Sequence, residues 1–139
     1  MKRRELIAAV GALAVAGGAT KASAQRPGDP HPPKYKALEE SAGKCGEDCL
    51  RHCLGMMSMK DTSMAACANS VVELIAACRA LQTLASVNST FTPAFAKTVG
   101  AVCAACEQEC RKFYAKYTVC KACGDACKTC GDECHKIAA

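Results

Sequence analysis

The sequence contains no tryptophan, and aromatic residues make up only 4% of it. No segment shows the period-two alternation of apolar and polar residues that a half-buried β-strand requires. The uncharged run at residues 6–20 is shorter than the roughly 20 apolar residues of a transmembrane helix. These absences argue against a β-sheet fold and against a membrane-spanning segment, and they leave an all-α chain as the expected fold class.

The beginning of the chain has the features of an export signal. Lys2, Arg3 and Arg4 form a positive start, residues 6–20 are small and apolar, and residues 22–24 form an Ala-Ser-Ala cleavage site. The arginine pair and the weakly apolar run favour the twin-arginine route, which exports folded proteins. We therefore expect residues 1–24 to be removed and the mature protein to reach the periplasm or internal membranes without inserting into them. An ordinary secretory signal or an uncleaved anchor is the alternative.

The mature chain is expected to be one domain of nearly balanced charge. The signal carries three of the five net positive charges, so 115 residues with a net charge of +2 remain. This charge gives no reason to expect binding to nucleic acid or to an anionic membrane surface. Residues 25–34 contain four prolines and one glycine and are expected to form an extended leader ahead of a domain at residues 35–139.

Cysteine is the unusual component of the chain, and all 13 cysteines lie in the mature part. In an exported protein this fraction normally indicates a disulfide-stapled structural domain. However, an odd number leaves at least one thiol unpaired, and small disulfide scaffolds are usually rich in loops. In the stretch CKACGDACKTCGDEC the cysteines instead recur at steps of three, four, three and four residues, which is the period of an α-helix.

The same period predicts four amphipathic helices, at about residues 35–57, 63–86, 92–113 and 118–138. Residues 60–63 are expected to end the first helix and to cap the second. Thr92 is expected to cap the third, with Pro93 at its first position. Four such helices with short connections pack best as an antiparallel four-helix bundle, and the alternation places thiols along its core.

The two ends of this bundle are expected to differ, because antiparallel order brings the first and third turns together at one end. We call it the Met/His end, and its residues are His52, Met56, Met57, Met59 and Met64. The second turn and the C-terminus lie at the other end, where an apolar plug is expected. The plug residues are Leu38, Leu81, Leu84, Phe95, Val99 and Ile137.

A core of thiols is better suited to metal binding than to packing, since leucine or isoleucine would fill it without an oxidation hazard. Zinc needs four ligands, so the thiols would hold only about three ions. Each such site would keep a charge near −2, which is costly to bury without cations. Cu(I) is selected by soft sulfur ligands. With bridging thiolates, about one Cu(I) per cysteine would give a neutral core.

The predicted metal ligands follow from this reasoning. His52 shares a helical face with Cys49 and Met56 and is expected to join them, while the thioethers would bind Cu(I) weakly at an entrance. An iron–sulfur cluster is not indicated, because its C-x2-C-x2-C loop spacing is absent. The complete predicted ligand set is Cys45, Cys49, Cys53, Cys67, Cys78, Cys103, Cys106, Cys110, Cys120, Cys123, Cys127, Cys130, Cys134, His52, Met56, Met59 and Met64.

Three residues of similar chemistry are left without a predicted role. Met57 can be explained as a flexible side chain that fills a gap. His135 lies in the last helical turn, where a surface histidine is favoured by the helix dipole. His31 belongs to the leader.

Four stretches together resemble the bacterial copper storage proteins, in particular their exported branch. These are KCGEDCLRHCLGMMSMKDTSMAAC at residues 44–67, FTPAFAK at 91–97, VCAACEQEC at 102–110 and CKACGDACKTCGDECHK at 120–136. The resemblance spans residues 35–139. It implies a homotetramer of four-helix bundles that stores many Cu(I) ions, with a histidine and methionines contributing at one end.

The sequence thus predicts a protein of copper homeostasis that is not an enzyme. Its cargo is Cu(I), in several ions per chain, and the resemblance implies a recipient such as the membrane methane monooxygenase, another copper enzyme or a copper chaperone. Sequestration of zinc or cadmium is the nearest alternative. A thiol-disulfide oxidoreductase is the enzymatic alternative, and it would need one exposed C-x2-C pair set apart from the others.

Overall fold

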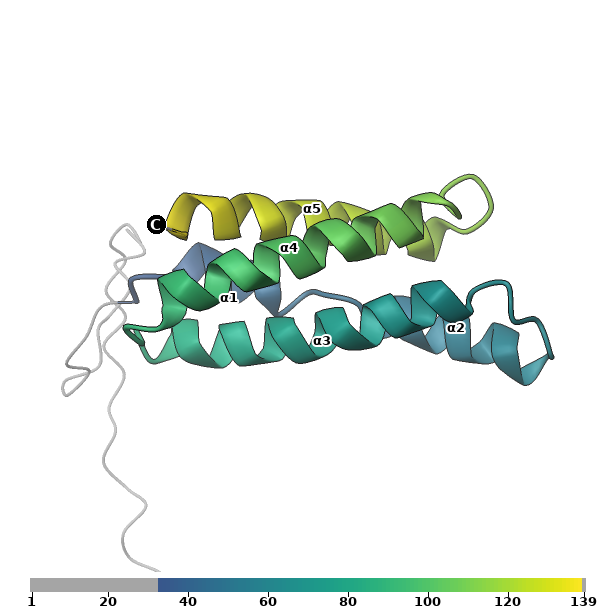
Figure 1. Cartoon of the computed structure of the whole chain (residues 1–139), viewed down its shortest axis with the longest axis horizontal. Coiled ribbons are helices and arrows are strands. Elements are labelled where there is room, and N and C mark those ends of the chain that lie inside the picture. The colour runs from purple at the N-terminus through teal and green to yellow at the C-terminus, as the bar shows by residue number, and fades with distance from the viewer. Residues whose placement is uncertain (1–32, 139) are drawn as a thin grey trace, which may run out of the picture. The chain divides into compact units, whose positions relative to one another are not determined.

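The computed structural model describes residues 33–138, and the regular structure in that range is entirely helical. Figure 1 shows the long helices α3 (Ala65–Ser86), α4 (Thr92–Arg111) and α5 (Thr118–Ile137) side by side. The shorter helices α1 (Lys36–Ala42) and α2 (Glu47–Ser58) follow one another along the bundle, and both pack against α3 and α5. Together they replace one long helix. The predicted all-α bundle with a cysteine-lined core is therefore confirmed, while the predicted signal and most of the leader lie outside the described residues.

The predicted continuous first helix is wrong, because the chain leaves the helical conformation between Ala42 and Glu47. Gly46 has a φ of 91°, in the left-handed region that favours glycine. A Cβ atom at this position would also lie 2.9 Å from Cγ1 of Ile75 on α3. The break is therefore fixed by both backbone conformation and packing, and it lets Cys45 reach the core from a non-helical segment.

Two predicted helix starts are also displaced. Helix α3 begins at Ala65, and its N-cap residue, Met64, makes no side-chain hydrogen bond to the helix. The Asp61 carboxylate instead accepts a hydrogen bond from the Ser63 amide within the preceding turn, at 2.9 Å. Helix α4 includes Thr92 as a helical residue, and Phe91 takes the capping position. The Thr92 hydroxyl is buried and has no hydrogen-bond partner among the described residues.

The bundle separates sulfur from charge. All 13 cysteines are buried, whereas no acidic or basic side chain within residues 33–138 is buried. The charged residues instead form ion pairs on the outer helix faces, such as Lys121 with Asp125 at 2.6 Å and Lys128 with Asp132 at 2.8 Å. Exposed pairs of this kind stabilise a helix by only about 0.3–0.5 kcal/mol each. None of the helices in the described range has the length and apolar character needed to cross a membrane.

The different compositions of the two ends are confirmed. The α2–α3 and α4–α5 turns lie at the same end of the bundle (Figure 1). There the ring of His52 on α2 stands 4.5 Å, centroid to centroid, from the ring of Tyr117 before α5. At the opposite end Leu38, Leu81 and Val99 are fully buried. The other predicted plug residues, Leu84, Phe95 and Ile137, are only half-buried.

Candidate metal centre

The thiol core consists of the 13 cysteines, twelve from helices α2 to α5 and Cys45 from the break between α1 and α2. All are free thiols, and none exposes more than 5% of its surface. A thiol-disulfide oxidoreductase would need an accessible pair of cysteines, and no such pair is found. The cysteines are thus arranged as one continuous buried set, as the helical spacing predicted.

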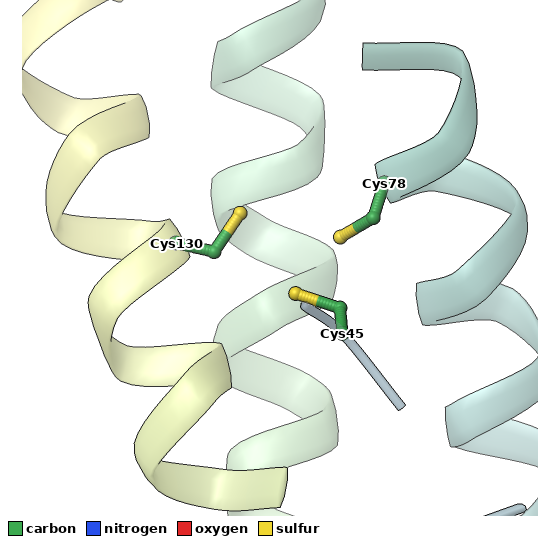
Figure 2. A group of neighbouring side chains, drawn as sticks. All are labelled: Cys45, Cys78 and Cys130. Carbon is green, nitrogen blue, oxygen red and sulfur yellow. The ribbon is translucent and has the colours of Figure 1, made fainter. Parts of the chain in front are cut away.

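The first of three sulfur triads joins three separate segments. Cys45 comes from the break between α1 and α2, Cys78 from α3 and Cys130 from α5, and their sulfur atoms lie within 4.8 Å of one another. Figure 2 shows the three sulfur atoms pointing toward one another. A soft metal ion placed between them could bind thiolates from three parts of the chain at once.

The thiol core contains two further sulfur triads. In each, the sulfur atoms again lie within 4.8 Å of one another. In the second triad, the sulfur atoms from α3 and α4 are 3.8 Å apart. The second triad is Cys49, Cys67 and Cys110, and the third is Cys106, Cys123 and Cys127.

Each of the remaining four cysteines lies close enough to a triad for the thiols of that triad to shift its pKa. Interaction with Cys130 is the largest cause that raises the pKa of Cys103, and also that of Cys134. The pKa of Cys49 is lowered, first by Cys110 and against an opposing contribution from Cys123. Neighbouring thiols of different triads therefore interact, and the sulfur atoms form a connected network rather than isolated sites.

Burial keeps part of the metal-free core protonated. Desolvation is the largest cause that raises the pKa of Cys120 to about 12, and it also raises the pKa of Cys53 well above its usual range. Both groups are therefore neutral thiols near pH 7. Because a metal ion binds thiolates, loading must release their protons, and the metal must supply the charge that this buried site lacks.

The Met/His end provides neutral ligands that bind Cu(I) more weakly than thiolates and range from buried to exposed. The Nε2 atom of His52 is buried and has no hydrogen-bond partner among residues 33–138. A buried unsatisfied nitrogen is costly unless something binds it, and a metal ion would satisfy it. Met64 is fully buried, Met56 and Met57 pack at the edge of the core, and Met59 exposes 69% of its surface. These side chains therefore extend from the core to the solvent.

Some features of the site had no signal in the spacing pattern. Tyr117 was not predicted as a neighbour of His52, although its position just before α5 places it at the same end. The break at Gly46 was also missed, although two closely spaced glycines could have indicated it. His135 is exposed, as expected for a surface residue, and His31 lies outside the described residues.

The comparisons with known proteins agree with this geometry. A search of curated proteins gave no match. The family model described as copper storage protein matches residues 32–139, which include all five helices and all 13 cysteines. That description agrees with the three sulfur triads, each of which could hold a metal ion. The chain therefore belongs to the copper storage protein family.

Proposed function

We propose that this protein stores Cu(I) as a chain of copper ions bridged by the thiolates of its core. The observation that carries the proposal is the set of three buried sulfur triads in a core where no charged side chain of residues 33–138 is buried. Copper and bridging thiolate in about equal number cancel each other's charge, and a neutral cluster is the state that low dielectric favours. The capacity would be about 13 Cu(I) per chain, one for each cysteine.

Zinc fits the same core less well. Four thiolates around each Zn²⁺ leave a charge near −2, and no Lys or Arg side chain among the described residues is buried to balance it. Each triad also brings three sulfur atoms together, an arrangement that suits bridging thiolates. A fourth ligand could join each triad. Storage of zinc or cadmium is thus the competing outcome of the first experiment.

The biological setting of this function is part of the proposal. We infer that the chain is exported through a twin-arginine signal at residues 1–24, since folding before export would keep the thiols reduced. We also infer that the protein assembles as a homotetramer and supplies copper to methane monooxygenase, another copper enzyme or a chaperone. Both inferences rest on the resemblance of the sequence to exported copper storage proteins. A role in storage makes catalysis unnecessary, and the core offers no accessible thiol for it.

Anaerobic titration tests the storage function. Reduced protein is titrated with Cu(I) against a chelator that competes for it, and the bound copper is counted. We expect saturation at about one Cu(I) per cysteine. Saturation at about one to three ions per chain, or displacement of bound copper by zinc, would refute storage of Cu(I) in the core.

The Met/His end is proposed as an axial entrance to the core. Replacing His52 by Ala, and Met56, Met59 and Met64 by Leu, removes the soft ligands with little change in volume at the methionines. We expect slower loading from the acetonitrile complex of Cu(I), and slower release, with most of the capacity kept, measured by stopped-flow absorbance of the copper–thiolate bands. Unchanged rates in this quadruple variant would show that the entrance is elsewhere.

A further inference from the structure

A pocket lies on the side of the bundle, at the break between α1 and α2. Its volume is about 180 Å³, below the roughly 300–1,000 Å³ typical of pockets for drug-sized ligands, so only a small ligand fits. It is distinct from the Met/His end, because Met56 follows Cys49 by seven residues, about 10 Å along a helix. Among the lining residues are Lys44, Glu47 and Cys49 on one side and Val119, Ala122 and Cys123 on the other.

The pocket leads to the thiol core. Its two cysteines belong to different triads, Cys49 to the second and Cys123 to the third. Cys123 is also the most exposed of the 13 thiols, at 5%, where the others lie between 0% and 2%. A ligand in this pocket would therefore meet two buried sulfur atoms midway along the network, without passing the Met/His end.

The charges around the pocket favour an anionic ligand. Glu47 is paired with Arg79 at 3.4 Å, and Asp48 with Arg51 at 2.8 Å, so both acidic side chains of the rim are already balanced. In the described part of the chain, the ammonium of Lys44 has no ion-pair partner. Lys44 is exposed and supplies the uncompensated positive charge of the rim.

We propose that this lateral pocket is a second entrance, where a bis-thiolate complex of Cu(I) with a small thiol delivers its copper to Cys123 and Cys49. The inference rests on the proposed storage of Cu(I). When the Cys123 sulfur bonds to copper, one copper–sulfur bond to the small thiol, the carrier, breaks. The released carrier takes up the Cys123 proton and leaves as a neutral thiol. The same exchange at Cys49 releases the second carrier thiol. Copper stays Cu(I) and no electron is transferred. The bis-thiolate complex formed with the two cysteines carries the same net charge of −1 as the complex that delivered the copper.

The test fills the pocket without touching a sulfur ligand. Ala122 is an exposed helical residue, and Ala122→Phe places a ring in the pocket. Reduced full-length protein is mixed with Cu(I) in excess 2-mercaptoethanol, a small thiol, and loading is followed by stopped-flow absorbance. We expect loading about tenfold slower than in the unaltered protein, with the same final amount of copper. Ala80→Phe, at an exposed position of α3, is the matched control and should load normally.

If the phenyl ring of Ala122→Phe disturbs folding, a change of charge at Lys44 tests the same proposal. Lys44→Glu should slow loading from the anionic bis-thiolate complex of 2-mercaptoethanol by about tenfold at low salt, but not loading from the cationic acetonitrile complex. Wild-type rates for Ala122→Phe, or equal slowing of both copper sources by Lys44→Glu, would overturn the lateral entrance. A total capacity of about one to three ions would instead refute the storage function, whatever the rates.

Discussion

The thiol core and the Met/His end both provide sulfur ligands but differ in access to solvent. Every cysteine of the core is buried, and most are within 4.8 Å of two other sulfur atoms. At the Met/His end, exposure runs from fully buried Met64 to Met59, which is 69% exposed. Thiolates bind Cu(I) strongly and carry charge, whereas thioethers are neutral and bind it weakly. We therefore expect the thiol core to determine how much copper is bound, and the Met/His end and the lateral pocket to determine how fast copper is exchanged.

The largest expected effect is the loss of copper sites when one triad is removed. Changing Cys45, Cys78 and Cys130 to Ala deletes the sulfur atoms of the first triad. We expect the capacity, measured by anaerobic titration against a chelator, to fall by about three Cu(I) per chain. The remaining copper should still bind, because the other two triads keep their ligands.

The control for this triple variant removes buried volume without removing sulfur. Val71→Ala with Val99→Ala truncates two fully buried side chains and should leave the capacity unchanged. An equal loss of copper in both proteins would mean that capacity depends on packing rather than on particular thiols. Full capacity in the triple variant would show that the first triad is not a storage site.

The next expected effect is a difference in stability between variants of a buried and an exposed methionine at the Met/His end. Met64→Ala opens a cavity in the packed core and should lower the free energy of unfolding by about 2–4 kcal/mol. Met59→Ala changes an exposed side chain and should alter it by no more than about 0.5 kcal/mol. Chemical denaturation of the reduced, metal-free proteins measures both. Similar destabilisation by the two changes would contradict the placement of Met59 in solvent.

Much of this arrangement could be predicted from the spacing of residues. The steps of three and four in α5 place five cysteines on one helical face, and an apolar face at that period has to be buried. Antiparallel order then places His52 and the methionines at one end. These predictions succeed because they depend on local periodicity and on the direction of successive helices.

The features that were missed depend on contacts between segments. The cysteine period continues from Cys45 to Cys49 and Cys53, so it gives no sign that the helix is broken at Gly46. That break depends on the left-handed conformation of Gly46 and on its close approach to Ile75. Likewise, the membership of each sulfur triad depends on the rotation and axial offset of the helices, which one helix's own period does not specify.

The last expected effect is a pH dependence that should belong to the core and not to the Met/His end. Burial raises the pKa of Cys120 from about 9 to about 12. The unfolded chain therefore loses this proton first, so the contribution to stability is complete below pH 9 and is lost as the pH rises toward 12. Denaturation of reduced, metal-free protein at a series of pH values should show this decline, and Cys120→Ala should reduce it. Met59→Ala should leave the slope unchanged, because its thioether does not titrate; a slope that responds to Met59 but not to Cys120 would contradict the assignment.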